Sequence, residues 1–393
     1  MKKILFVIPT LRMGGAEKAL VSLLRSLDPE DAEVDLFLFE QGGVLQKMVP
    51  SWVRILPENV ITRAMLLEFR FYWFGLIRSG HLLTAARRLW AFIKAHIHIP
   101  LHRKNELYWA KTAKTIPALE GEYDIAIGFL EGVTDFYVID KVTARKKIGW
   151  IHTDFAQKQL SSEEVALYRK FDHIATITPT CADSFRNATG ISPDRVTVVE
   201  NITIPEDIIS ASQEDVGIIW DKSIRHIVTV SRLEKQKGVD LALEACMLLQ
   251  KSTDRFCWHI LGDGSLRSWL ESEIATNGLG PYLILEGSKE NPYPYMKNAY
   301  VIVQPSRTEG KSIVLDEAKI LGKAIITTNY PSVIDQITDG KNGLITEISA
   351  NSIAEKIKET LNHPELVRRL EIGNAISGVS VQDKLLPFLQ LIS

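Results

Sequence analysis

The chain has 393 residues, of which 46% are hydrophobic and 24% are charged, and its formal net charge is −2. This length is greater than one hydrophobic core usually serves, so we expect two domains. The ordinary composition excludes a wholly disordered chain, and the near-neutral charge gives no support to nucleic acid as the main partner.

The cysteines are odd in number, scattered, and without CxxC spacing: Cys181, Cys246 and Cys257. This pattern favours neither a disulfide framework nor a zinc site. A reducing compartment suits such a chain best. The sequence therefore predicts a cytoplasmic protein that needs no metal.

The chain opens with two lysines and an apolar run, Ile4–Ile8, which together resemble a secretory signal. The run is too short for a signal peptide and ends at Pro9, so we interpret it as a first buried strand. A membrane-spanning helix needs about 20 apolar residues in succession. Because the sequence has no such run, we expect no transmembrane segment.

Short apolar runs alternate with helical patterns through the first half of the chain. A Gly14-Gly15 turn leads from the first strand into a helix over 16–27. Further strands are predicted at Val34–Phe39, Ile125–Phe129, Lys147–Ile151, Ile174–Thr178 and Val196–Glu200. This alternation predicts a doubly wound parallel sheet.

A second series of strands begins after an acidic, irregular stretch at 202–223. Its members are predicted at Ile227–Val230, Trp258–Leu261, Leu283–Glu286, Val301–Gln304 and Ala324–Thr328. We therefore predict an N-terminal domain over 1–204, a C-terminal domain over 205–375, and a last helix over 376–393 that could return to the first domain. In such an α/β protein, two Rossmann-like parallel sheets face each other across a cleft, and ligands bind at the carboxyl ends of the strands.

The strongest motif follows the strand Val301–Gln304. The loop after it reaches a helix start near Ser312, where free backbone amides and the helix dipole favour a phosphate. Glu309 lies in the loop, and Glu317 lies eight residues later in the helix. These carboxylates could accept hydrogen bonds from hydroxyls at the two ends of one ligand. The alternative is a capping acid and a surface acid.

A second motif, Ser231–Gly238, directly follows the strand Ile227–Val230. The Arg232 guanidinium and the Lys237 ammonium could hold a diphosphate without a metal. The alternative is a solvated charged loop.

Three weaker motifs also lie where predicted strands end. Gly14 and Gly15 would let the backbone approach a ligand, but the segment lacks the GxGxxG spacing of a dinucleotide site. His152 follows the strand Lys147–Ile151, although a lone histidine is more often structural. Gly262-Asp263-Gly264 also ends a strand, and GxG alone has little specificity.

In their order and content, these motifs resemble glycosyltransferase family 4, also called group 1, whose members have the GT-B fold. Glu309–Glu317 with Arg232 and Lys237 is the most specific part, and the run from Glu309 to Ile337 is similar to the branch that builds bacterial capsule and other surface polysaccharides. The resemblance implies catalytic roles for His152, Arg232, Lys237 and Glu309. It implies donor binding by Gly14, Gly15, Gly262, Gly264, Lys289, Ser312, Ile313, Val314, Leu315 and Glu317.

In detail, the resemblance implies that His152 contacts the transferred sugar, that Glu309 binds its hydroxyls, and that Glu317 binds the ribose. It also implies a retaining hexosyltransferase that uses a nucleotide-sugar donor, with UDP expected from family frequency, and a lipid-linked glycan acceptor. The resemblance implies no requirement for a metal or other cofactor. Two departures from many relatives, Lys311-Ser312 and 329–332, leave the donor sugar open.

Three other functions use similar architectures. A nucleotide-sugar epimerase would bind the same donor without an acceptor, but the chain offers no convincing additional acid–base carboxylates. A non-catalytic sugar-nucleotide-binding subunit would not need the intact set of charged residues. An NAD oxidoreductase is disfavoured because the dinucleotide fingerprint is missing.

Residues 61–115 interrupt the strand–helix pattern with basic and aromatic side chains, among them Trp73, Phe92 and Tyr108. A basic amphipathic helix here could lie on an anionic membrane, with Arg87, Arg88 and Lys94 facing the lipid, so we expect a peripheral protein at the inner face of the plasma membrane. The alternative is that the aromatic residues form core and the basic residues face solvent. A metal site at His96, His98 and His102 is disfavoured because Pro100 interrupts the helix.

Overall fold

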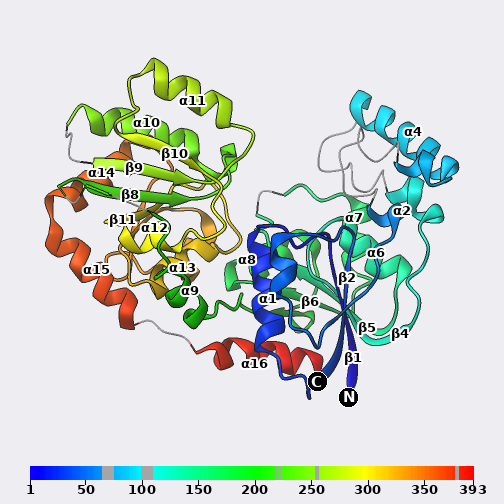
Figure 1. The fold of residues 1–393 in the computed structure, drawn as a ribbon. Helices are drawn as coiled ribbons and strands as arrows, with labels where there is room; N and C mark the ends of the chain where they lie inside the picture. Colours follow the sequence, from blue (N-terminus) through cyan, green and yellow to red (C-terminus); the bar gives the residue numbers. More distant parts are fainter. Residues whose placement is uncertain are drawn as a thin grey trace. The chain divides into compact units, whose positions relative to one another are not determined.

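The computed structural model describes residues 1–63, 75–98, 109–156, 158–217, 220–221, 223–252, 256–376 and 380–393. The chain divides into two compact units (Figure 1). The first unit comprises residues 1–202 together with 381–393, and the second comprises residues 203–380.

Seven strands in the described part of the first unit form one parallel sheet, in the order β3-β2-β1-β4-β5-β6-β7. Their bounds are β1 Lys2–Ile8, β2 Ala32–Leu38, β3 Arg54–Ile55, β4 Glu122–Gly128, β5 Thr143–Ile151, β6 His173–Thr176 and β7 Val196–Val198. In the interior strand β1, the side chains from Ile4 to Ile8 are fully buried, because helices cover both faces of the sheet.

The helices of the first unit connect successive strands. Their bounds are α1 Gly15–Ser26, α2 Val60–Arg63, α4 Leu82–His98, α6 Val133–Lys141, α7 Ser162–Tyr168 and α8 Pro179–Thr189, with 3-10 turns η1 Val44–Met48, η3 Ala113–Thr115 and η4 Pro193–Arg195. Local sequence sets their ends. Ser161 caps α7 by accepting a hydrogen bond from the Glu164 amide, and Thr178 caps α8 in the same way through the Cys181 amide.

In the second unit, the described residues form a six-stranded parallel sheet in the order β10-β9-β8-β11-β12-β13. Its strands are β8 Arg225–Val230, β9 Phe256–Leu261, β10 Leu283–Gly287, β11 Val301–Gln304, β12 Ile325–Thr328 and β13 Leu344–Thr346. Its helices are α9 Pro205–Ala211, α10 Val239–Gln250, α11 Arg267–Thr276, α12 Tyr293–Asn298, α13 Ile313–Ile320, α14 Ala350–Asn362 and α15 Pro364–Ile376, with η5 Lys235–Lys237 and η6 Pro331–Asp335. Together the two sheets confirm the predicted fold of two Rossmann-like parallel units.

The last helix, α16 (Val381–Ile392), packs on the first unit beside α1 (Figure 1). The Phe388 ring lies 6.0 Å from the Phe6 ring and 5.8 Å from the Trp150 ring. Lys2 and Lys146 donate to carbonyl oxygens in the last turn of α16. These cations satisfy carbonyls that have no partner within the helix, and they complement its dipole.

The described part of the segment 61–115 mixes core and surface. Trp109 is buried and donates from Nε1 to Asp140 Oδ2 at 2.6 Å. Trp90 is exposed beneath the Lys111 ammonium. Arg88 is 5% exposed, so the expectation that it faces solvent or lipid is wrong. It lies on the same face of α4 as the buried Thr84 and Ala85, one helical turn earlier.

Several expectations for this segment lie outside the described residues or side chains, namely those for Phe69–Phe74, Trp73, Lys94, His96, His98, Pro100, His102 and Tyr108. Within the described chain, none of the helices combines the length and apolarity needed to cross a membrane.

Candidate functional site

Lys237 and Glu309 form the centre of the candidate site. Lys237 ends η5, just after β8, and Glu309 lies in the loop after the neighbouring strand β11. The Lys237 ammonium donates to both Glu309 carboxylate oxygens at 2.7 Å. The side chains are 18% and 9% exposed, so the pair is largely shielded from water.

Three further hydrogen bonds fix Glu309. Its Oε1 accepts from Gln304 Nε2 at 3.0 Å and from Ser306 Oγ at 2.7 Å, and Ser332 Oγ donates to its backbone carbonyl at 2.8 Å. The carboxylate is therefore held as a preorganised acceptor at the carboxyl end of β11. The alternative in which Glu309 only caps a helix is wrong, because it lies in the loop before α13 and its partners are side chains outside that helix.

The two loops are locked against each other. Arg307 forms a bidentate ion pair with Asp240, at 2.6 and 2.8 Å, and its amide donates to the Gln236 carbonyl. Gly238 has φ +68°, and a Cβ there would lie 1.8 Å from the Pro305 carbonyl oxygen. Only glycine allows this approach, which explains the Lys-Gly sequence of the motif.

Glu317 lies on the buried side of α13 and is only 1% exposed, so it is not a surface acid. Tyr293, at the start of α12, donates to Glu317 Oε1 at 2.9 Å. Burial, and then the Glu317 charge, raise the Tyr293 pKa, so the phenol remains a donor at neutral pH. No motif pointed to Tyr293, because an aromatic residue at the start of a short helix is ordinary.

The start of α13 is partly occupied by Gln336. The Ser312 amide donates to Gln336 Oε1 at 2.8 Å, and Gln336 Nε2 donates back to the Ser312 carbonyl. The Ser312 amide is thus already bound, whereas Ile313, Val314 and Leu315 form the first turn of the helix, where amides have no intrahelical acceptor. The anion site expected at the amides of residues 312–315 is therefore limited to those of Ile313, Val314 and Leu315.

Arg232 is exposed in the loop after β8, and no ion pair to it occurs among the described residues. Its loop packs on the next one through backbone contacts. A Cβ at Gly262 would lie 1.8 Å from the Ser231 carbonyl oxygen, and one at Gly264 would lie 2.6 Å from that of Leu233. Loop packing alone requires both glycines, so their presence does not depend on a nucleotide base.

Lys289 has local partners. Its ammonium lies 3.6 Å from Glu286 Oε2 and 5.4 Å from the centre of the Tyr295 ring. Hydrogen bonding to Tyr295, together with the charges of Tyr295 and Glu286, raises the Lys289 pKa, so it remains a cation.

In the first unit, His152 follows β5, and its ring packs against Phe129 with centroids 4.9 Å apart. Burial lowers the His152 pKa to about 4, so the imidazole is neutral at pH 7. Its Nε2 is a buried atom for which the described residues provide no hydrogen-bond partner. Glu131, which the motifs did not reveal, accepts from the amides of His152 and Thr153 and positions this strand end.

Gly14 caps α1, and Gly15 begins it. A Cβ at Gly14 would lie 2.2 Å from Glu17 Oε2, so the close approach at this turn involves the helix itself. Glu40, at the end of β2, pairs with Arg12 at 2.7 Å and with Arg63 at 3.4 Å. The acid that would hold a ribose in a dinucleotide fold is therefore engaged by arginines.

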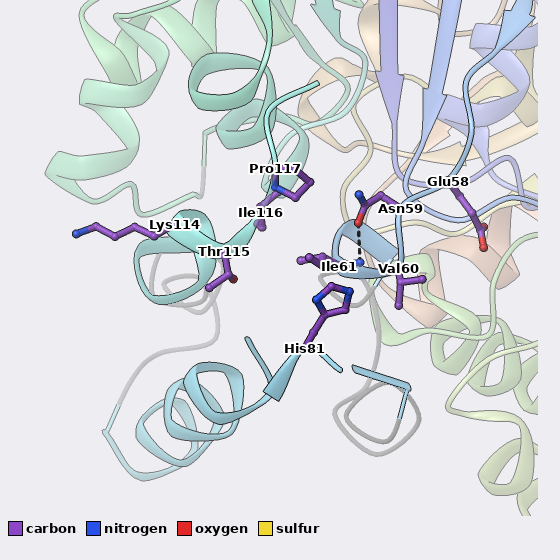
Figure 2. A pocket seen from close by; sticks show the side chains of 9 residues that line it. All are labelled: Glu58, Asn59, Val60, Ile61, His81, Lys114, Thr115, Ile116 and Pro117. Carbon is purple, nitrogen blue, oxygen red and sulfur yellow. Dashed lines mark hydrogen bonds between the residues drawn. The ribbon is translucent and has the colours of Figure 1, made fainter. Parts of the chain in front are cut away.

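A cavity of about 580 Å³ lies elsewhere in the first unit, where α2, η3 and the start of α4 meet (Figure 2). It is lined by Glu58, Asn59, Val60, Ile61, His81, Lys114, Thr115, Ile116 and Pro117. None of the site residues predicted from the motifs lines it. The structure thus places His152, Gly14 and Gly15 in the first unit and gathers Arg232, Lys237, Glu309 and Glu317 in the second.

Comparisons with solved structures define the class of fold. The crystal structure of Anabaena HepE in complex with UDP and glucose matches with a TM-score of 0.68 at 16% identity, over 100% of this chain and 99% of that one. The WaaG structure, described as a glycosyltransferase involved in lipopolysaccharide biosynthesis, matches with a TM-score of 0.64 at 14% identity, over 99% of each chain. The chain therefore has the GT-B fold.

Sequence comparison relates part of the chain to a known family. Residues 217–375 match the family model of glycosyl transferases group 1, which confirms the resemblance seen in the motifs. The chain is 24% identical over 381 residues to the Campylobacter jejuni GalNAc-alpha-(1->4)-GalNAc-alpha-(1->3)-diNAcBac-PP-undecaprenol alpha-1,4-N-acetyl-D-galactosaminyltransferase, with 95% of this chain and 93% of the relative aligned.

Other relatives align over shorter stretches. The Staphylococcus aureus poly(ribitol-phosphate) alpha-N-acetylglucosaminyltransferase is 28% identical over 172 residues, 43% of this chain and 34% of the relative. With several curated relatives, the chain aligns over only 34% to 53% of their length.

Proposed function

We propose that the chain is a retaining glycosyltransferase of surface polysaccharide synthesis, which transfers a hexose or N-acetylhexosamine from UDP to a lipid-linked glycan without a metal. The observation that carries the proposal is the Lys237–Glu309 pair at adjacent strand ends, close in sequence to the free amides of α13. It puts a cation, a fixed acceptor and an anion-binding helix start on one edge of one sheet.

Each group has a part in this reaction. Lys237, together with the exposed Arg232, neutralises the diphosphate as charge develops on the leaving oxygen. Glu309 accepts hydrogen bonds from sugar hydroxyls, because its carboxylate already has fixed partners. Glu317, oriented by Tyr293, accepts from the ribose.

The transfer step needs no protein nucleophile. The bond from the anomeric carbon to the diphosphate oxygen breaks, and the acceptor oxygen forms its bond on the same face of the sugar. The acceptor proton passes to the departing phosphate oxygen, so anomeric configuration is retained. Neutral His152 can accept a hydrogen bond from a hydroxyl of the transferred sugar at Nε2, but with its low pKa it does not serve as a general acid at pH 7.

The comparisons support the donor and acceptor classes. Anabaena HepE was crystallised with UDP and glucose, and the name of the C. jejuni relative specifies an undecaprenol-diphosphate glycan. The first unit would hold the acceptor, and α4 supports peripheral contact with the inner face of the plasma membrane because it exposes Leu82, Leu83, Trp90 and Ile93.

A transfer assay tests the proposal. The chain is incubated with a panel of UDP-sugars and an undecaprenol-diphosphate glycan in the presence of chelator, and the product linkage is determined by NMR. We expect an α-linked product from an α-linked donor, lost in Lys237→Met and kept in the exposed neighbour Lys235→Met. An inverted linkage would reject the retaining mechanism, and an epimerised donor without transfer would favour the epimerase.

A further inference from the structure

Three potential metal ligands lie close together on one face of the second sheet. β8 and β9 pair in parallel, with His226 opposite Cys257 and Val228 opposite His259. Residues two apart on a strand share a face, so Cys257 and His259 point the same way. Ligand atoms of His226, Cys257 and His259 all lie within 4.8 Å of one another, and all three residues are buried.

The outer nitrogens of both histidines are engaged. His226 Nε2 lies 3.0 Å from the Asp221 carbonyl oxygen, which can only accept, so this nitrogen carries a proton. His259 Nδ1 lies 2.9 Å from Glu286 Oε1 and donates to that carboxylate. A carbonyl and a carboxylate behind the rings are the partners that commonly orient metal-binding histidines.

The inner nitrogens then face each other with no proton between them. A neutral imidazole has one N–H, and each ring uses it on its outer partner. His226 Nδ1 and His259 Nε2 therefore both present lone pairs, only 3.0 Å apart. Two acceptors at this distance repel each other, unless a cation binds both.

The surroundings favour a metal over a proton. Cys257 adds a sulfur, the soft ligand that thiophilic metals select. The Trp220 ring stacks on both imidazoles, at 4.4 and 4.6 Å between centroids, and keeps water from their faces.

We propose that His226 Nδ1, Cys257 Sγ and His259 Nε2 bind one divalent cation of the zinc class. Binding forms a metal–sulfur bond, breaks the Cys257 S–H bond and releases that proton to solvent, while each neutral imidazole donates a lone pair. The Glu286 carboxylate balances the added charge from behind His259.

This site is separate from the proposed donor site. His226 and Cys257 are each the second residue of their strands, whereas Arg232 and Lys237 follow the carboxyl end of β8. The metal would join β8, β9 and the segment at Trp220–Asp221, and so would stabilise the second unit without taking part in transfer. Metal binding to the three proposed ligands can therefore be measured apart from UDP binding, whereas Glu286 also contacts Lys289, a residue expected to bind the donor.

Equilibrium dialysis of the full chain, without a histidine tag, against limiting zinc tests the proposal, with elemental analysis as the readout. We expect one zinc per chain, and with cobalt in its place a thiolate-to-metal charge-transfer band. Cys257→Ser should remove the band, and Glu286→Gln should weaken zinc affinity about 10- to 100-fold, as loss of such outer partners does. The matched control Cys181→Ser, a buried cysteine in the first unit, should retain both zinc and band.

Two results would overturn the proposal. One is wild-type chain that holds no zinc after dialysis while NMR shows His259 doubly protonated, because the bridging cation would then be a proton. The other is equal zinc in wild type, Cys257→Ser and His226→Gln. Circular dichroism and urea denaturation establish that each variant is folded, so loss of zinc is not mistaken for unfolding.

Discussion

The Lys237 ammonium contacts both carboxylate oxygens of Glu309, although 72 residues separate the two in sequence. Because β8 and β11 are neighbours in the sheet, the loops after them meet, and a cation from one reaches an acid from the other. The strand order of the second unit therefore brings together the two side chains at the centre of the candidate site.

Breaking this pair should cost both stability and activity. Lys237→Met leaves the buried Glu309 carboxylate without its counterion, and we expect a loss of about 3 kcal/mol in the free energy of unfolding, as for other buried pairs that lose one member. Urea denaturation measures this. Lys237→Met with Glu309→Gln should recover part of the loss, through a coupling of about 1–3 kcal/mol. Strict additivity of the two changes would contradict an energetic pair.

Sequence patterns located this edge of the sheet but not its supporting residues. Apolar runs followed by charged residues and a glycine predicted β8 and β11, and the loops after these strands carry Lys237 and Glu309. Tyr293 and Gln336 come from helical turns that have no distinctive spacing, so their contacts depend on tertiary packing alone. The two-residue β3 and the three-residue β13 were not predicted, and β3 is too short to show a hydrophobic period.

The sequence also did not show which residues of α4 are buried and which are exposed. Arg87 and Arg88 are adjacent, yet Arg88 is buried, since successive positions on a helix differ by about 100°. The cluster at His226, Cys257 and His259 likewise has no sequence signature, because the register of β8 and β9 brings it together rather than a motif spacing.

Donor binding should not require a divalent metal. In a chelated and dialysed sample, we expect UDP to raise the melting temperature, because Arg232, Lys237 and the first amides of α13 supply the countercharge. At a UDP concentration of 100 Kd, the stabilisation is about 2.7 kcal/mol. Arg232→Ala should reduce the shift, and Arg225→Ala, at the opposite end of β8, should not. A shift that vanishes with chelator yet survives Arg232→Ala would contradict metal-free binding.

Glu317 and Glu309 should differ in their kinetic effects. Ribose hydrogen bonds act equally in the ground state and the transition state, so Glu317→Ala should raise KM for the donor with little change in kcat. Tyr293→Phe should do the same to a smaller extent, because it removes only the orienting hydrogen bond. Glu309→Ala should lower kcat instead. Steady-state kinetics over a donor concentration series separates the two, and an unchanged kcat in Glu309→Ala would remove that residue from the site.

His152 should make stability depend on pH. Its pKa is 6.5 when unfolded and about 4 when folded, so the unfolded state binds more protons in between. The contribution is complete above about pH 6.5 and is lost as pH falls towards 4, by up to about 3 kcal/mol. Denaturation at several pH values should show a shallower slope for His152→Phe than for wild type, with His81→Gln as the control. Parallel slopes would contradict a buried neutral imidazole.

Membrane contact through α4 should have an apolar part and an electrostatic part. We expect the chain to float with anionic liposomes at low salt and to be partly released as salt rises, because charge attraction is screened within about 10 Å at 0.1 M salt.

Leu82 and Leu83 are both more than 60% exposed at the start of α4, so the double substitution Leu82→Ser and Leu83→Ser should remove the salt-resistant fraction. Arg87→Gln should weaken the salt-sensitive part of the binding free energy by about 1 kcal/mol, the value of one basic residue near such a surface. The control is Ile372→Ser, which changes an apolar side chain that is 55% exposed on α15 in the second unit and should leave flotation unchanged. Two results would show that α4 is not the contact. One is equal recovery with neutral and anionic liposomes, and the other is flotation that Ile372→Ser reduces as much as the α4 double substitution does. Either result would make a soluble acceptor the better hypothesis.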